Sequence, residues 1–447
     1  MEQSQKLRWT TKLLYGVGDT GNAIVNSAIQ FFLMVFYTDG ALIAPALASS
    51  ALLIGKIWDG INDPLFGWFS DRTRSRFGKR RVYMIFGALP LAIAVILLWR
   101  VPAGLSNVGT FLWIAGTFVL FDTVWTLTNV PYYALTAELT DDYDERSSLT
   151  AWRMVLAVPA YIVGAALTPF LVGLFASKRD GYGMVGILYG ILACAVLWIA
   201  AAGLRERVQV ARSAARAAPW RALLDAFRNR PFVRLLVAYL LANTAFALIK
   251  TLMAYFLTYQ LAMESQVFLV MGLMLVCVAL FLFPWRWLAA RWNKGPAYAL
   301  GLSIGALAVA ATFFLPQGPS PWIYAIAVVA GIGFSAQWVF PWAMVPDVVE
   351  MDRLQSGEHR SGIYYGVWGL VTKLSDALGI AATGWILQLY GYVPNVAQST
   401  HTLSGIRLFF GPVPLLFFAA ALPLLIWYPI TRRSHAQMLQ QLQEKTP

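Results

Sequence analysis

Cysteine, histidine and charged side chains are all scarce in this chain. Its 447 residues include two cysteines and three histidines, and only 13% of them are Asp, Glu, Lys or Arg. Cys194 and Cys277 lie within apolar runs, so we expect two buried thiols and no disulfide. The histidines are scattered and form no metal-ligand pattern, which argues against a histidine-based metal site.

Apolar side chains predominate in the composition. Hydrophobic residues make up 59% of the chain, more than a soluble globular domain of this length carries. The sequence therefore predicts an all-α polytopic membrane protein whose partner is the lipid bilayer. Segment 1–11 is polar and has no cleavable signal pattern, so we expect the first spanning helix to direct insertion into a plasma membrane or bacterial inner membrane.

The net charge of +12 is concentrated in two short loops. These basic residues are Arg72, Arg74, Arg76, Lys79, Arg80 and Arg81 in the first loop, and Arg205, Arg207, Arg212, Arg216, Arg221, Arg228, Arg230 and Arg234 in the second. Basic loops of this kind face the cytoplasm in membrane proteins. The charge therefore indicates topology, and no nucleic-acid partner is expected.

Twelve apolar segments are long enough to span a bilayer. They are 13–38, 43–70, 82–101, 109–138, 151–176, 184–204, 232–260, 266–289, 297–315, 322–350, 362–391 and 404–429. The even number places both termini, the loops 71–81, 139–150, 290–296 and 351–361, and the linker 205–231 on one side. The charge of these loops makes that side cytoplasmic.

A repeat divides the chain into two six-helix halves. Pro131-Tyr132-Tyr133-Ala134 is echoed by Pro341-Trp342-Ala343-Met344, and Arg146-Ser147 by Arg360-Ser361. A parallel duplication about an axis along the membrane normal resembles the plan of the major facilitator superfamily. We expect an N-terminal bundle at 1–204 with the cation site, a cytoplasmic linker at 205–231, a C-terminal bundle at 232–431 and a cytoplasmic tail at 432–447.

Segment 43–70 carries charged residues near the middle of a predicted spanning helix, where burying a charge is most costly. Lys56, Asp59, Asn62 and Asp63 fall on about a third of the helix circumference. Each charge at a helix centre costs roughly 2.5–3.5 kcal/mol on insertion scales. Several oxygen donors on one stripe suit a small cation, and Pro64 can open local carbonyls. The alternative is a Lys56–Asp59 ion pair that only holds helices together.

Three further segments carry polar groups, and each group has two possible interpretations. Asp122 and Thr126 share a helix face, so Thr126 is a candidate oxygen ligand, although helix–helix hydrogen bonding also explains a buried threonine. Lys373 and Asp376 form either a satisfied pair or a charge network in which Lys373 responds to the acids of segment 43–70. Arg153 is either an interfacial residue with a snorkelling side chain or a cavity-facing cation.

Aromatic residues make up 14% of the chain. Many are expected to face lipid or the membrane interface. Those beside polar groups, including Tyr133, Trp338 and Trp342, are candidates to line a substrate cavity.

Four motifs resemble the glycoside-pentoside-hexuronide:cation symporter family, the melibiose permease-like branch of the superfamily. They are Lys12-Leu13-Leu14-Tyr15-Gly16-Val17-Gly18, Trp58-Asp59-Gly60-Ile61-Asn62-Asp63-Pro64, Thr73-Arg74-Ser75-Arg76-Phe77-Gly78-Lys79 and Gly391-Tyr392-Val393-Pro394-Asn395. The resemblance implies a cation, usually Na⁺, held at positions matching Asp59, Asn62, Asp63 and Thr126, with Lys373 close by. The loop that contains Asp71 and Arg72 resembles the superfamily's loop between its second and third helices, which implies a cytoplasmic latch between the halves at these two residues. Plain topogenic charge is the alternative for that loop.

The sugar site of that family is changed here. The family's sugar-binding acids and a neighbouring lysine correspond to Ala23, Asn129 and Asn22, whereas positions matching Arg153 and Trp338 are kept. A second resemblance, to the sodium-dependent lysophosphatidylcholine symporter branch, rests on four other segments. These are Phe121-Asp122-Thr123, Val130-Pro131-Tyr132-Tyr133-Ala134-Leu135-Thr136, Thr150-Ala151-Trp152-Arg153-Met154 and Pro341-Trp342-Ala343-Met344-Val345-Pro346-Asp347-Val348.

These features predict a cation-coupled symporter, not an enzyme, that works as a monomer by alternating access. Na⁺ is the expected coupling ion and H⁺ the alternative, with no other cofactor. The solute is a sugar or glycoside, or alternatively a lysophospholipid. Two other classes are remote: a non-transporting scaffold or receptor, and an intramembrane aspartyl protease. Gly16-Val17-Gly18-Asp19 fits a protease motif, but Asp19 lies near the start of its helix.

Overall fold

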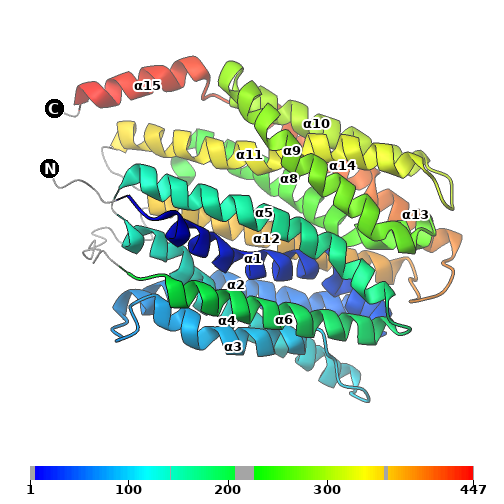
Figure 1. Cartoon of the computed structure of the whole chain (residues 1–447). Helices are drawn as coiled ribbons and strands as arrows, with labels where there is room; N and C mark the ends of the chain where they lie inside the picture. The colour runs from blue at the N-terminus through cyan, green and yellow to red at the C-terminus, as the bar shows by residue number, and fades with distance from the viewer. Residues whose placement is uncertain (1–5, 141, 207–225, 357–360, 446–447) are drawn as a thin grey trace. The chain divides into compact units, whose positions relative to one another are not determined.

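All regular secondary structure in the described part of the chain is helical (Figure 1). The computed structural model describes residues 6–140, 142–206, 226–356 and 361–445, and contains no strand within those ranges. Contacts group the helices into two compact units. The first unit also includes residues 387–397, which come from the far end of the sequence.

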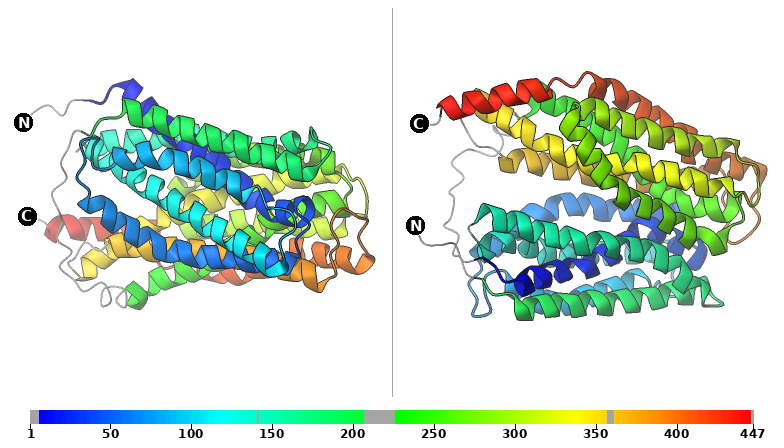
Figure 2. Two further views of the ribbon diagram at one scale, coloured as in Figure 1. Left: turned by 90° about the horizontal axis from the view of Figure 1, so that it is seen from below. Right: turned by 45° about the horizontal axis from the view of Figure 1, so that its top comes forward.

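The first unit contains six long helices. They are α1 (Trp9–Val35), α2 (Pro45–Arg72), α3 (Arg81–Leu98), α4 (Asn107–Leu139), α5 (Tyr143–Gly173) and α6 (Lys178–Gly203). Helix α1 continues into a π-helical turn at Phe36–Gly40. It packs against both α5 and α6, as Figures 1 and 2 show from three directions.

The second unit repeats this arrangement. Its helices are α8 (Arg230–Tyr255), α9 (Val267–Arg291), α10 (Lys294–Ala311), α11 (Trp322–Ser356), α12 (Ser361–Leu389), α13 (Thr400–Phe410), α14 (Pro412–Ile426) and α15 (Arg432–Lys445). Contacts of α2 with α4, α3 with α4, α3 with α6 and α1 with α6 recur as α9 with α11, α10 with α11, α10 with α14 and α8 with α14. Two pseudo-symmetric bundles are therefore present, as the duplicated motifs predicted.

Ten stretches of the described chain are long and apolar enough to cross a membrane. They comprise α3, α4, α5, α6, α8, α9, α10, α11, α12 and the α13–α14 pair. Helices α1 and α2 are long enough but too polar to qualify, because α1 carries Asp19 and Asn22 and α2 carries Lys56, Asp59 and Asp63. The count of twelve spans and the cytoplasmic termini therefore stay predictions.

Several helix boundaries differ from the expected ones. Helix α5 begins at Tyr143 and not at 151, so most of the expected 139–150 loop is helical. The cause is local: the Asp142 side chain accepts a hydrogen bond from the Glu145 backbone N–H and caps the helix. Ser177 caps α6 in the same way, so α6 begins at Lys178 instead of 184. The tail is also largely helical, as α15.

Glycine allows the closest helix contacts. A Cβ on Gly164 of α5 would lie 2.6 Å from the carbonyl oxygen of Ile24 in α1. In the second unit, a Cβ on Gly333 of α11 would lie 2.6 Å from Gly305 Cα in α10. Side chains at these two positions would push the paired helices apart.

Candidate functional site

The predicted cation ligands of α2 meet α4 in the first unit. Asn62 is completely buried, and its Nδ2 donates to the backbone oxygen of Asp122 at 3.1 Å and to Asp122 Oδ2 at 3.3 Å. Thr126 Oγ1 donates to Asp63 Oδ1 at 2.9 Å. The periodicity that put these residues on one face of each helix therefore brings the two faces together.

Lys56 and Asp59 extend this cluster along α2. Their charged atoms lie 3.6 Å apart, and Asp59 is only 7% exposed. The Lys56 ammonium also lies 5.5 Å from the centre of the Phe118 ring on α4. The expected Lys56–Asp59 pair is present, and it lies in the same α2–α4 interface as Asn62 and Asp63.

The donor set can be judged against the needs of a small cation. Within the described ranges, no group of three or more His, Cys, Asp or Glu side chains is placed to hold a metal ion. A cation here would need carboxylate, amide and hydroxyl oxygens together, the oxygen chemistry of hard ions. Asn62 Oδ1 supports such a role, because it is buried and has no hydrogen-bond partner. An unsatisfied buried acceptor is costly unless something binds it.

A second polar cluster joins α1, α4 and α5. Arg153 Nε lies 3.7 Å from Asp19 Oδ2, and the guanidinium carbon lies 4.7 Å from the centre of the Tyr133 ring. Tyr133 donates its hydroxyl to Asp19 Oδ1 at 3.2 Å. Asn22 Nδ2 donates to Asn129 Oδ1. Four of the six predicted substrate residues therefore meet here, and Arg153 faces other protein groups instead of snorkelling.

This second cluster also has unsatisfied atoms. Asn22 Oδ1 is a buried acceptor, and Arg153 Nε is a buried donor, and neither has a hydrogen-bond partner. The cluster therefore retains one unused acceptor and one unused donor.

Helix α4 connects the two clusters. Asp122, Thr126, Asn129 and Tyr133 follow one another at intervals of three or four residues, so they lie on one face of α4. Asp122 and Asn129 are seven residues apart, which is about 10 Å along the axis. A polar stripe therefore runs from the candidate cation ligands to the Asp19–Arg153 cluster.

The predicted residues of segments 322–350 and 362–391 lie in the second unit. Asp376 of α12 pairs with Lys250 of α8 at 3.3 Å, where the sequence had suggested Lys373 as its partner. Lys373, one turn before Asp376, is half-buried. On α11, Trp338 is half-buried and Trp342 is 55% exposed, with its ring 6.4 Å from that of Trp368.

Two charged residues, Asp19 and Lys250, were not among the site residues predicted from the sequence. Asp19 belongs to the protease-like motif near the start of its helix, and Lys250 lies within an apolar segment. Both are less than 10% exposed, and both form ion pairs. The signal was the one that singled out Lys56, namely a charge inside a spanning segment.

The predicted latch stays a prediction. The side chain of Asp71 lies outside the described residues, and Arg72 is exposed. The loop after α2 is instead held within the first unit: Arg80 Nε donates to Glu138 at 2.9 Å, and Glu206 accepts the backbone N–H groups of Lys79, Arg80 and Arg81. In the second unit, Lys294 and Asp347 make the equivalent contact at 2.7 Å.

Known proteins are similar to this chain in sequence along its whole length. The MFS/sugar transport protein family matches residues 14–432. An uncharacterized symporter of Synechocystis is 30% identical over 99% of this chain and 98% of its own. Sodium-dependent lysophosphatidylcholine symporter 1 of Gallus gallus is 28% identical over 100% of this chain and 92% of that protein.

The fold is also shared with solved transporters. An inward-facing, unoccupied bacterial homolog of the human lysosomal transporter Spinster has a TM-score of 0.70 at 14% identity, covering 97% of this chain and 98% of that one. The protein is therefore an integral membrane protein and not an enzyme. The chain belongs to the MFS/sugar transport protein family of symporters.

Proposed function

We propose that this protein is a Na⁺-coupled symporter that imports a sugar or glycoside by alternating access. The observation that carries the proposal is the buried oxygen cluster between α2 and α4, with the unsatisfied Asn62 Oδ1 at its centre. A cation bound there would supply the partner that this oxygen lacks.

Cation binding is expected to favour solute binding through charge and through α4. Asp59, Asp63 and Asp122 bring three carboxylates to the interface, with Lys56 as a partial counter-charge. A bound cation would reduce their mutual repulsion and hold α2 against α4. Because Asn129 and Tyr133 lie on the same face of α4, the second cluster would be held as well. The resulting bias toward one conformation is the physical content of coupling.

The second cluster suits a hydroxyl-rich solute. Arg153 and Asn22 offer an unsatisfied donor and acceptor, and the Tyr133 ring supplies an aromatic face. Sites built from buried polar groups discriminate strongly against solutes that leave those groups unpaired. This chemistry favours a sugar or glycoside.

A lysophospholipid is the second candidate. It is favoured by the end-to-end similarity to a symporter named for sodium-dependent lysophosphatidylcholine transport. The paired Asp19 and Arg153 would in that case complement a zwitterionic head group.

Uptake into proteoliposomes tests the proposal. Labelled monosaccharides, glycosides and lysophosphatidylcholine are offered under an inward Na⁺ gradient, an inward H⁺ gradient or neither. We expect Na⁺-stimulated uptake of a sugar, and loss of that stimulation in Asp63→Asn. Stimulation by H⁺ alone would reassign the ion, and Na⁺-driven uptake of lysophosphatidylcholine alone would reassign the solute. Uptake of a solute that responds to neither the Na⁺ gradient nor the H⁺ gradient would contradict symport.

A further inference from the structure

A cavity of about 540 Å³ lies in the first unit, where the ends of α3 and α6 diverge. Its walls come from the end of α3, the loop to α4, Trp113 of α4, Phe175 in the loop before α6, and the first three turns of α6. No predicted cation or solute residue lines it. Its volume is within the range of roughly 300–1,000 Å³ that small-ligand sites occupy.

Packing of large and small residues creates this divergence. Trp99 stacks on Tyr182 with ring centres 5.4 Å apart, and a Cβ on Gly186 would lie 2.7 Å from Trp99 Cβ. At Gly183, one turn nearer the start of α6, a Cβ would meet only Arg100 Nε and the Trp99 backbone oxygen, both at 3.9 Å. The helices are thus in close contact at Gly186 and leave room beside Gly183.

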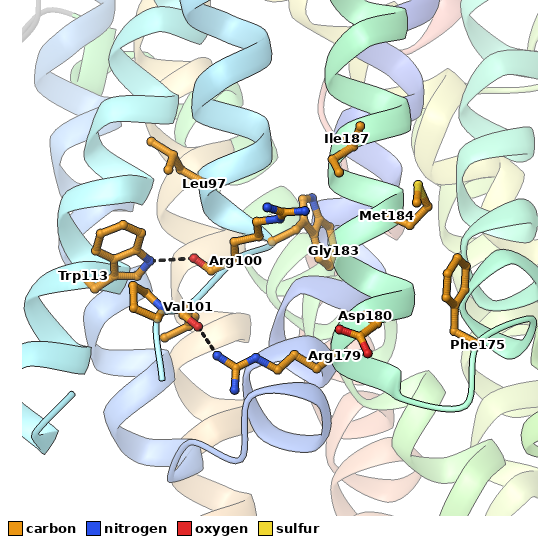
Figure 3. Close-up of a pocket in the computed structure, with 12 residues that line it drawn as sticks. Leu97, Arg100, Val101, Trp113, Phe175, Arg179, Asp180, Gly183, Met184 and Ile187 are labelled. Carbon is orange, nitrogen blue, oxygen red and sulfur yellow. Dashed lines mark hydrogen bonds between the residues drawn. The ribbon is translucent and has the colours of Figure 1, made fainter. Parts of the chain in front are cut away.

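The cavity has a charged end and an apolar end. Figure 3 shows Arg179 and Asp180 toward one end, Leu97 and Ile187 toward the other, and Arg100 between them. Asp180 and Ile187 are seven residues apart on α6, about 10 Å along its axis. The apolar end therefore extends toward the middle of the helices.

The charged groups have capacity for a ligand. Among the described residues, the side chains of Arg100 and Asp180 make no hydrogen bond or ion pair. Arg179 uses one of its guanidinium nitrogens on the Val101 backbone oxygen and forms no ion pair with Asp180 in this part of the structure. Two guanidiniums and one carboxylate complement a phosphate that carries a nearby ammonium.

An exposed apolar stripe leads away from the cavity. Met184, Leu188 and Ile191 lie one above another on α6 and are 45%, 45% and 59% exposed. An acyl chain could lie along this stripe, while the indoles of Trp99 and Trp113 suit the interface between head groups and chains. Trp113 is held there by donating to the Arg100 backbone oxygen at 3.0 Å.

We propose that this cavity binds a bilayer phospholipid with a primary amine head group, outside the transport site. Arg100 and Arg179 bind the phosphate, Asp180 binds the ammonium, and one acyl chain follows Met184 and Leu188. Guanidinium–phosphate and ammonium–carboxylate contacts are both charge-assisted hydrogen bonds. The proposal does not depend on the coupling ion or on the transported solute.

Native mass spectrometry of the full chain tests it, with phosphatidylethanolamine, phosphatidylglycerol, phosphatidylcholine and soluble glycerophosphoethanolamine as probes. We expect phosphatidylethanolamine to bind best, because only it combines the phosphate with a primary amine and acyl chains. Arg100→Gln should weaken it about tenfold. Asp180→Asn should remove the preference over phosphatidylglycerol by weakening phosphatidylethanolamine binding, without weakening phosphatidylglycerol binding.

The second unit supplies a matched control. Arg407 donates to the Phe313 backbone oxygen after α10, as Arg179 donates to Val101 after α3. Arg407→Gln should therefore leave phosphatidylethanolamine binding unchanged, whereas Arg179→Gln weakens it. Gly183→Leu, which fills the cavity and keeps its charges, should also weaken binding. Thermal unfolding without added lipid identifies any variant that is misfolded.

Two results would overturn the proposal. One is wild-type phosphatidylethanolamine binding in a folded Arg100→Gln or Gly183→Leu variant. The other is equal binding of soluble glycerophosphoethanolamine, which would show that the acyl chain contributes nothing.

Discussion

Asn62 and Thr126 show how single polar residues define the candidate cation site. Both side chains are at most 2% exposed, so water cannot satisfy them freely. Thr126 contacts Asp63, and Asn62 contacts Asp122 while keeping one oxygen without a partner. The site therefore depends on oxygens whose only available partner is a bound ion or a neighbouring side chain.

Replacing Thr126 with valine should weaken Na⁺ binding about tenfold, because one neutral oxygen and the hydrogen bond that orients Asp63 are lost. The measurement is the Na⁺ concentration that gives half-maximal thermal stabilisation. Thr123→Val is the control. Thr123 bonds Trp58 at 2.8 Å across the same helix pair but contacts none of the candidate cation ligands. Equal effects of the two variants would show that only helix packing matters.

Arg153→Lys should reduce solute binding and preserve stabilisation by Na⁺. The guanidinium lies both beside Asp19 and over the Tyr133 ring, and an ammonium cannot reproduce the planar contact. Solute affinity measured by calorimetry, alongside the Na⁺-induced thermal shift, separates the two effects. Arg146→Lys, on the same helix, is the control, since Arg146 Nε donates to the Thr140 backbone oxygen, which is not part of the Asp19–Arg153 cluster. Unchanged solute affinity in Arg153→Lys would remove Arg153 from the solute site.

At the scale of helices, packing depends on a few positions without side chains. Gly164 brings α5 onto α1, and Gly333 brings α11 onto α10. These contacts set the rotation of α1 and α11, and thereby which of their polar faces can reach a neighbour. Polar helices such as α1 and α2 can lie inside the bundle because other helices cover their charged side chains.

Gly333→Ala is expected to destabilise the protein by about 1–3 kcal/mol, because the added Cβ would overlap the α10 backbone, which cannot yield as a side chain could. Gly366→Ala is the matched control on α12, where no described heavy atom lies within 4 Å of the added Cβ. It should be neutral or slightly stabilising, because alanine favours a helix. Thermal unfolding of both variants checks this, and equal midpoints would contradict it.

At the scale of the whole molecule, coupling requires that ion and solute bind to the same conformation more tightly than to the alternative. The two clusters of the first unit share α4, so each can bias the position of that helix. The second unit has an ion pair of its own, in which buried Lys250 contacts half-buried Asp376.

The coupling should be reciprocal. Saturating Na⁺ should raise solute affinity by some factor, typically about 5–150-fold for linked sites, and saturating solute should raise Na⁺ affinity by the same factor. Calorimetric titrations in both orders measure the two factors. Asn129→Leu, which breaks the bond between α1 and α4, should lower both factors together. Factors of one in the wild type, that is, no effect of either ligand on the affinity for the other, would contradict coupling between the two sites.

Much of the fold follows from local properties of the chain. Apolar length predicted the helices, and the paired motifs predicted the repeat, because helix formation in a bilayer responds to short windows of sequence. Helix periodicity also placed Asp59, Asn62 and Asp63 on one stripe. Capping by Asp142 is local too, but hydropathy does not detect a cap, so the predicted start of α5 at residue 151 was wrong.

The partners of these residues were decided by the tertiary structure. Asp376 pairs with Lys250 and Arg153 with Asp19, although each partner is more than 100 residues away in the sequence. Sequence by itself determined which charges lie within helices and which faces carry them. Which face meets which depends on the rotation of each packed helix, and that is set by contacts between distant segments, such as Gly164 with Ile24, that no local pattern encodes.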